Sequence, residues 1–290
     1  RARRSLFVAR VLAATSPRRA ARGAGGVYAR GGTASNVARA GEFLRSSCER
    51  QMAGMGGDWF GVCSPACGEE LLARNGSGRA PAALDAAKLR DKGEKTVPLR
   101  SADAVTIPTA IDAFCHLSES VGKLGLDALL APAIHYAEAG VPVAPRVAFD
   151  WATDGGTLQG RARDHFLING KTPRVGDLFR APGQAEVLRR VAAQGRDAFY
   201  TGEIAEDMIA TLQAAGGSHS AEDFAAARCE ATTPVSGQYK DLEVVEHPPN
   251  GQGATALLLI NILSHFDIAG MDPQGAERLA IEAEATKLAH

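Results

Sequence analysis

Residues 53–81 read AGMGGDWFGVCSPACGEELLARNGSGRAP, a stretch that predicts two strands leading into a polar turn that carries an arginine. The apolar run WFGV at 59–62 is typical of a buried strand, and a second strand begins near Leu71. Between the two strands, residues 65–68 contain proline and glycine and are expected to turn the chain back. The stretch therefore predicts an antiparallel strand pair that delivers a turn at its end.

The turn itself, NGSGR at residues 75–79, is the first candidate functional site. Arg79 lies between Gly78 and Pro81, so its backbone is constrained on both sides. A guanidinium held in this way suits a carboxylate, which it can bind with two parallel hydrogen bonds. The alternative interpretation is a solvated loop arginine, because single charges on turns are common. The residues by themselves leave both interpretations open.

Composition excludes several classes of protein. The chain has 290 residues, 45% of them hydrophobic, and a net charge of −1, so it can bury a large core and has no bias toward nucleic acid. No run of about eighteen apolar residues occurs, and no membrane-spanning helix is expected. The five cysteines have no paired spacing, which argues against a disulfide framework or a zinc site. We predict no cofactor and no metal ion.

Apolar residues at the spacing of α-helices begin at Thr109. The spacing predicts several helices and one hairpin of strands 235–239 and 242–246; the helices cover 109–139, 184–194, 203–215 and 276–290. Ser220 and Asp223 match the N-cap of one more short helix. The last helix has no breaker at its end, so we expect the fold to continue beyond residue 290.

Three further segments carry specific expectations. Residues 104–108 are predicted to form a short strand. Residues 254–266 leave so little polar surface that their helix is expected to be buried on nearly all sides. Residues 1–48 are rich in arginine and are predicted to hold one strand and two helices, with the arginines on solvated faces.

Several familiar motifs are incomplete. Gly170-Lys171-Thr172 resembles the end of a phosphate loop, but His165 stands where the required glycine would be. No dinucleotide fingerprint and no G-x-S-x-G elbow is complete. His116 and His135 fall in predicted helices with no second ligand at a matching spacing, so we interpret them as structural or surface residues.

A set of short motifs nonetheless follows one order along nearly the whole chain. They are GMGGD at 54–58, NGSGRAP at 75–81, APAI at 131–134, AEAGVPV at 137–143, DAFYTGEIA at 197–205, PVSG at 234–237, PP at 248–249, NIL at 261–263, EA at 282–283 and KLA at 287–289. This ordered set resembles the large subunit of the gamma-glutamyltranspeptidase family, which includes the related cephalosporin (glutaryl) acylases.

The resemblance implies an α+β fold, the four-layer αββα sandwich of N-terminal-nucleophile hydrolases, with residues 1–290 as a single domain that forms its large-subunit portion. In such an enzyme the precursor cuts itself, and the new N-terminal Thr of the small subunit attacks the amide carbonyl of the substrate. The expected partners are that small subunit and a gamma-glutamyl or glutaryl amide. No catalytic residue is expected within this chain.

The resemblance also assigns roles by position. Arg79 matches the arginine of the family that binds the substrate carboxylate, and Asn75, Ser77 and Gly78 would shape its pocket. Thr232-Thr233 resembles the threonine pair at the cleavage site, but it precedes the PVSG motif of an internal strand, so we interpret it as structural.

Departures from the family pattern concern the substrate. The chain has GRAP at 78–81 where transpeptidases typically have an Arg-Glu-Met-Ala-Pro sequence, and PNGQG at 249–253 in place of Pro-Pro-Ser-Ser-Gly-Gly. Both favour the acylase-like branch, in which a glutaryl group replaces gamma-glutamyl. A further departure is GGTASN at 31–36, where the family has Gly-Gly-Asn-Ala-x-Asp. A noncatalytic relative that only binds small carboxylates is the alternative from another class.

The compartment stays open. The resemblance implies a secreted or periplasmic protein, whereas five cysteines without paired spacing are compatible with the cytoplasm.

Overall fold

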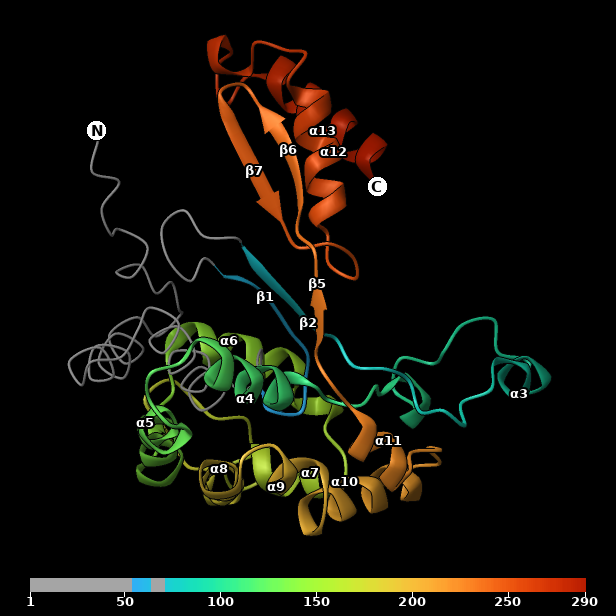
Figure 1. Ribbon diagram of the computed structural model, residues 1–290, viewed down its shortest axis with the longest axis vertical. Helices are drawn as coiled ribbons and strands as arrows, with labels where there is room; N and C mark the ends of the chain where they lie inside the picture. The colour runs from blue at the N-terminus through green and yellow to red at the C-terminus, as the bar shows by residue number, and fades with distance from the viewer. Residues whose placement is uncertain (1–53, 64–70) are drawn as a thin grey trace. The chain divides into compact units, whose positions relative to one another are not determined.

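The computed structural model describes residues 54–63 and 71–290, which combine helices and strands (Figure 1). This mixture confirms the predicted α+β class. The predicted elements of residues 1–48 and the predicted turn at 65–68 lie outside the described residues.

The described chain divides into two compact units. The helical unit consists of residues 54–58 and 78–228, and the sheet unit consists of residues 59–77 and 229–290. The prediction that residues 1–290 form one domain of a larger hydrolase stays a prediction.

The helical unit is built around two helices that pack along each other, α5 and α8. Their facing side chains Leu129, Leu130 and Leu188 are fully buried, as the helical spacing predicted. Gly140 ends α5 with a φ of 93°, which favours glycine. The elements of the unit are α3 Ala86–Asp91, η2 Ala102–Ala104, α4 Ala110–Val121, α5 Leu126–Ala139, β3 Val141–Pro142, α6 Pro145–Asp154, η3 Gly155–Thr157, α7 Arg161–Phe166, β4 Leu178–Phe179, α8 Pro182–Gln194, α9 Asp197–Tyr200, α10 Glu203–Ala214 and α11 Ala221–Ala226.

A second apolar cluster covers the short antiparallel pair β3–β4 of the helical unit. Trp151 of α6 lies against Phe179 of β4, with ring centroids 4.8 Å apart, and Val147 of the same helix is also buried. The predicted cap of α11 is confirmed, because Ser220 and Asp223 form a reciprocal capping box.

The sheet unit contains an antiparallel sheet in the order β1-β2-β5, and a separate hairpin of β6 and β7. Helix α12 packs on the hairpin, and α13 packs on α12 (Figure 1). The two predicted strands before the turn, the hairpin and the last helix are thereby confirmed. The elements are β1 Trp59–Cys63, β2 Leu72–Gly76, β5 Glu230–Thr232, β6 Val235–Tyr239, β7 Leu242–Glu246, α12 Gly253–Leu263, η4 Ile268–Gly270 and α13 Ala276–Ala289.

Three expectations about individual segments were wrong. Residues 104–108 form no strand: the 3-10 helix η2 ends at Ala104 and an extended segment follows. The run 59–62 is a strand but not a buried one, because Phe60 is 38% and Val62 40% exposed. In α12, Leu258 is 54% exposed, since one hairpin and one helix cover only part of its circumference.

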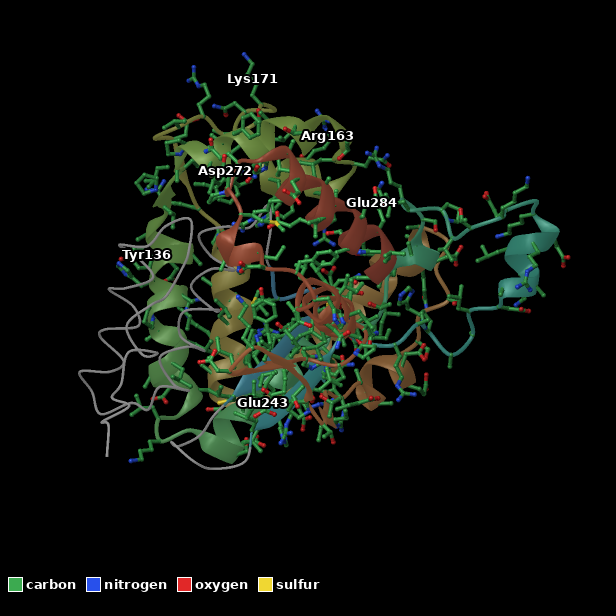
Figure 2. All side chains as sticks on the ribbon, turned by 90° about the horizontal axis from the view of Figure 1, so that it is seen from above. Tyr136, Arg163, Lys171, Glu243, Asp272 and Glu284 are labelled. Carbon is green, nitrogen blue, oxygen red and sulfur yellow. The ribbon has the colours of Figure 1, made fainter. Side chains whose placement is uncertain are left out.

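A buried ion pair ties two helices of the helical unit. Charged side chains such as Lys171 and Glu284 are exposed (Figure 2), whereas Asp112 of α4 is only 4% exposed. Arg196 donates from Nε to Asp112 Oδ1 at 2.5 Å and from Nη2 to the carbonyls of Ala225 and Ala227. Arg196 thereby joins the starts of α4 and α9 to the end of α11.

Tyr200 completes this group. Its ring lies under the guanidinium of Arg196, 4.5 Å from the centroid, and its hydroxyl accepts a hydrogen bond from Asp112 N. That amide is in the first turn of α4, where no helical carbonyl can pair with it. Burial is the main cause that raises the pKa of Tyr200, so the phenol stays protonated.

Replacing Arg196 with Ala should lower the free energy of unfolding by about 3–5 kcal/mol, because it removes one partner of a buried ion pair. Thermal and denaturant unfolding of the purified protein measure the loss.

The matched control is Arg189→Ala. Arg189 pairs with Glu138 and Glu186 at the surface, where its side chain is 43% exposed. Such pairs contribute about 1 kcal/mol or less. Equal losses in the two variants would contradict the account of the buried pair.

Candidate functional site

The end of β2 is held by a ring of side-chain hydrogen bonds within the sheet unit. Asn75 Oδ1 accepts from Ser77 N at 2.9 Å, which closes an Asx turn. Asn75 Nδ2 donates to Asn250 Oδ1 at 3.0 Å, and Asn250 Nδ2 donates to Ser77 Oγ at 3.2 Å. Asn250 is a participant that sequence reasoning missed, although it lies in the departing segment 249–253.

A histidine fixes the loop that carries Asn250. The ring nitrogens of His247 lie 2.7 Å from the carbonyl oxygen of Pro248 and 3.0 Å from that of Arg74 in β2. The His247 ring also meets Phe60 of β1 edge-on, with centroids 5.3 Å apart. The loop after β7 is thereby anchored to both strands that lead into the turn.

Gly78 is the first residue of the turn that belongs to the helical unit. Its backbone has a conformation that favours glycine. Its φ is +71°, and a Cβ on it would lie 1.9 Å from the carbonyl oxygen of Ile107. One residue later, Arg79 O accepts a hydrogen bond from Ile107 N at 2.9 Å. The chain at 78–79 thus lies directly against the extended segment that follows η2.

Arg79 is exposed, and the backbone that follows it is fixed as well. Pro81 is buried, and its carbonyl accepts from Leu84 N at 3.0 Å to close a turn. Ala82 N donates to Asp223 Oδ1 at 2.9 Å. An exposed arginine on a fixed backbone is suited to a carboxylate, because its planar donors can bind two oxygens at once.

The four predicted site residues fall into two pairs that are held by different contacts. Asn75 and Ser77 meet each other through a turn and Asn250, and Gly78 and Arg79 are placed by Ile107. Their joint role in one pocket stays a prediction. Across the described ranges 54–63 and 71–290, no group of three or more His, Cys, Asp or Glu side chains is arranged to hold a metal ion.

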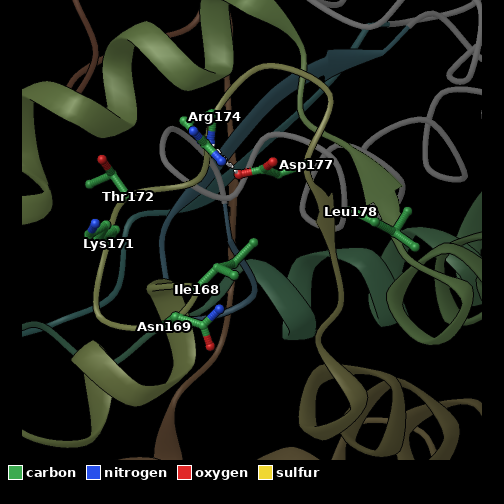
Figure 3. A pocket seen from close by; sticks show the side chains of 7 residues that line it. All are labelled: Ile168, Asn169, Lys171, Thr172, Arg174, Asp177 and Leu178. Carbon is green, nitrogen blue, oxygen red and sulfur yellow. Dashed lines mark hydrogen bonds and ion pairs between the residues drawn. The ribbon is translucent and has the colours of Figure 1, made fainter.

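Lys171 and Thr172 of the Gly170-Lys171-Thr172 segment line a cavity of about 830 Å³ (Figure 3). Asp177 accepts from the backbone N of Arg174 at 2.9 Å, and Figure 3 shows the two side chains facing each other. No helix begins after Thr172 before α8, so the segment lacks the helix N-terminus of a phosphate loop. The rejection of that motif is confirmed.

Two other sequence interpretations also agree with the structure. Thr232 lies in β5 opposite Ala73 of β2, which is the structural position expected for it. His116 and His135 are exposed on helices.

In the described part of the chain, no helix is long and apolar enough to cross a membrane.

Comparison with known proteins identifies the family of the chain. The sequence profile described as Gamma-glutamyltranspeptidase matches residues 20–290. The chain is 33% identical to the glutathione hydrolase-like YwrD proenzyme of Bacillus subtilis over 263 residues, which are 89% of this chain and 49% of the relative. The chain therefore spans about half the length of the curated relatives it matches.

Solved structures show the same fold. A cephalosporin acylase from Bacillus halodurans is 34% identical, with a TM-score of 0.85 over 93% of this chain and 51% of that one. The gamma-glutamyltranspeptidase of Helicobacter pylori is 22% identical, with a TM-score of 0.88 over all of this chain and 83% of that one. These likenesses define the fold as that of N-terminal-nucleophile hydrolases. The chain belongs to the gamma-glutamyltranspeptidase family, as the ordered motifs predicted.

Replacing Gly78 with Ala should reduce the stability of the protein. The positive φ alone costs an L-residue about 1–2 kcal/mol, and the new Cβ would push the chain away from Ile107. The measurements are the thermal midpoint and the free energy of unfolding in denaturant.

Gly93→Ala is the matched control, because Gly93 has a φ of +84° but no heavy atom within 4 Å of the added Cβ. It should show only the cost of the positive φ, and therefore a smaller loss of stability than Gly78→Ala. Identical behaviour of the two variants would show that the contact with Ile107 does not matter.

Proposed function

We propose that this chain is the large-subunit part of a self-processing gamma-glutamyl transpeptidase or hydrolase, and that Arg79 binds the carboxylate of its substrate. The observation that carries the proposal is the exposed Arg79 on a backbone fixed by Ile107, by the turn at Pro81 and by Asp223. A backbone that is already ordered loses little conformational freedom when the cation on it binds, which favours affinity.

The companion small subunit would supply the nucleophile. Its N-terminal Thr hydroxyl attacks the amide carbonyl while its own free amine accepts the hydroxyl proton. The tetrahedral intermediate expels the amine, which takes up a proton, and leaves an ester between the acyl group and the Thr. Water then releases the acid, or a second amine takes the acyl group. Arg79 orients the far end of the acyl group and takes no part in bond breaking.

A glutaryl-type acylase is the second candidate. The favouring observations are the 34% identity to the Bacillus halodurans cephalosporin acylase and the PNGQG segment at 249–253. Gamma-glutamyl and glutaryl groups carry the same terminal carboxylate and differ by one α-amino group. Turnover of matched gamma-glutamyl and glutaryl 4-nitroanilides by the processed protein therefore separates the two candidates.

Arg79→Ala should raise KM for the preferred anilide roughly ten- to hundredfold with kcat little changed, because hydrogen bonds to a charged group contribute about 1.5–3 kcal/mol. Arg79→Lys should recover only part of the loss, since lysine keeps the charge but not the paired donors. Steady-state kinetics on the processed protein measure both effects.

The control is Arg90→Ala, which removes an exposed arginine from α3. Its KM should equal that of the unmodified protein. If Arg79→Ala also left KM unchanged, the role proposed for Arg79 would have to be abandoned.

A further inference from the structure

Asp223 makes one more hydrogen bond than a helix cap requires. Its Oδ2 accepts from the backbone N of Ser220 at 3.0 Å and from Ser220 Oγ at 2.9 Å, which completes the capping box of α11. Its Oδ1 accepts from Ala82 N at 2.9 Å, 141 residues away in sequence. The two oxygens of one carboxylate thus join the start of α11 to the segment that follows Arg79.

The short segment 79–82 is held by a hydrogen bond at each end, and the bond from Ala82 to Asp223 is the second of these. Arg79 O is held by Ile107 N, and three residues later Ala82 N is held by Asp223. Between them, Pro81 is buried and restricts the backbone further. Loss of either end would leave Arg79 on a segment attached at one side.

The residues just before α11 also contact the segment that holds the first end of residues 79–82. His219 is only 1% exposed, and its Nε2 lies 2.8 Å from the carbonyl oxygen of Val105, two residues before Ile107. Gln213 Nε2 donates to the carbonyl of His219 at 2.7 Å. Residues 219–223 therefore contact both backbone segments that define the position of Arg79.

The charge state of Asp223 suits this role. Burial by itself would raise its pKa, but the hydrogen bonds from Ala82 and Ser220 outweigh burial and hold the pKa below its usual value. The group is a carboxylate at neutral pH, and hydrogen bonds to a carboxylate are stronger than those to a neutral acceptor.

We propose that Asp223 is a positioning residue for substrate binding: through Ala82 N it holds the backbone that presents the Arg79 guanidinium to the substrate carboxylate. The inference rests on the function proposed for Arg79 and extends it to a residue that touches no substrate. This role distinguishes Asp223 from an ordinary capping-box residue, whose effect would be confined to the stability of α11.

Two variants break the same bond from opposite sides. Asp223→Ala removes the acceptor. Ala82→Pro removes the donor and leaves the capping box intact; Ala82 is exposed and follows Pro81 in the turn closed by Leu84, a position where proline is favoured. Each should raise KM for the preferred anilide on the order of tenfold with kcat little changed, the effect of one charge-assisted hydrogen bond.

The matched control is Ser220→Ala, which weakens the cap and keeps the bond between Ala82 and Asp223. It should lower the thermal midpoint slightly and leave KM unchanged. If Asp223→Ala does not fold or is not processed, Ala82→Pro decides the question alone, because it leaves the cap untouched.

Double variants test whether Asp223 acts through Arg79. In the Arg79→Ala background, neither Asp223→Ala nor Ala82→Pro should raise KM further. A further rise of the same size, or an unchanged KM for Ala82→Pro with Arg79 present, would overturn the inference while leaving the function of Arg79 in place. An unchanged KM for Arg79→Ala would instead remove the proposed function and the inference with it.

Discussion

The contact of Gly78 and Arg79 with the backbone of Ile107 is the constraint on which the candidate site depends. The carbonyl oxygen of Ile107 occupies the place of a side chain on Gly78, and its amide holds the carbonyl of Arg79. With Asp223 holding the chain three residues later, the backbone is fixed while the guanidinium remains exposed. A long side chain on a fixed backbone starts from a defined position, which limits the backbone entropy lost on binding.

Strong local patterns predicted much of the fold. The hairpin strands 235–239 and 242–246 have the expected bounds, and the Ser220 cap has the expected partner. These features depend on neighbours in sequence, so the sequence contains the information that specifies them. The errors concern burial and pairing. An apolar helix such as α12 looks equally buried whether two elements cover it or four, and sequence spacing does not record how many are present.

In the candidate site, too, the sequence predicted local features and missed contacts between distant segments. Glycine, asparagine and arginine at 75–79 indicated a turn with a cation, and family resemblance indicated what the cation binds. Neither indicated Asn250, which is 173 residues from Ser77 and 175 from Asn75. Likewise, the spacing of Ser220 and Asp223 predicted the cap but not the hydrogen bond that the other carboxylate oxygen of Asp223 accepts from Ala82. Hydrogen bonds between distant segments are set by tertiary packing, and local sequence patterns do not predict them.

We propose that this chain positions the substrate and that a companion chain supplies the nucleophile, in a family whose curated relatives are about twice its matched length. The intact mass and N-terminal sequence of every polypeptide in the purified protein test this proposal most directly. We expect a second, smaller chain that begins with Thr. A single uncleaved polypeptide that still turns over the amide, or a companion that begins with a residue lacking a nucleophilic side chain, would contradict it. A sample that binds carboxylates without any companion or turnover would instead identify a noncatalytic relative.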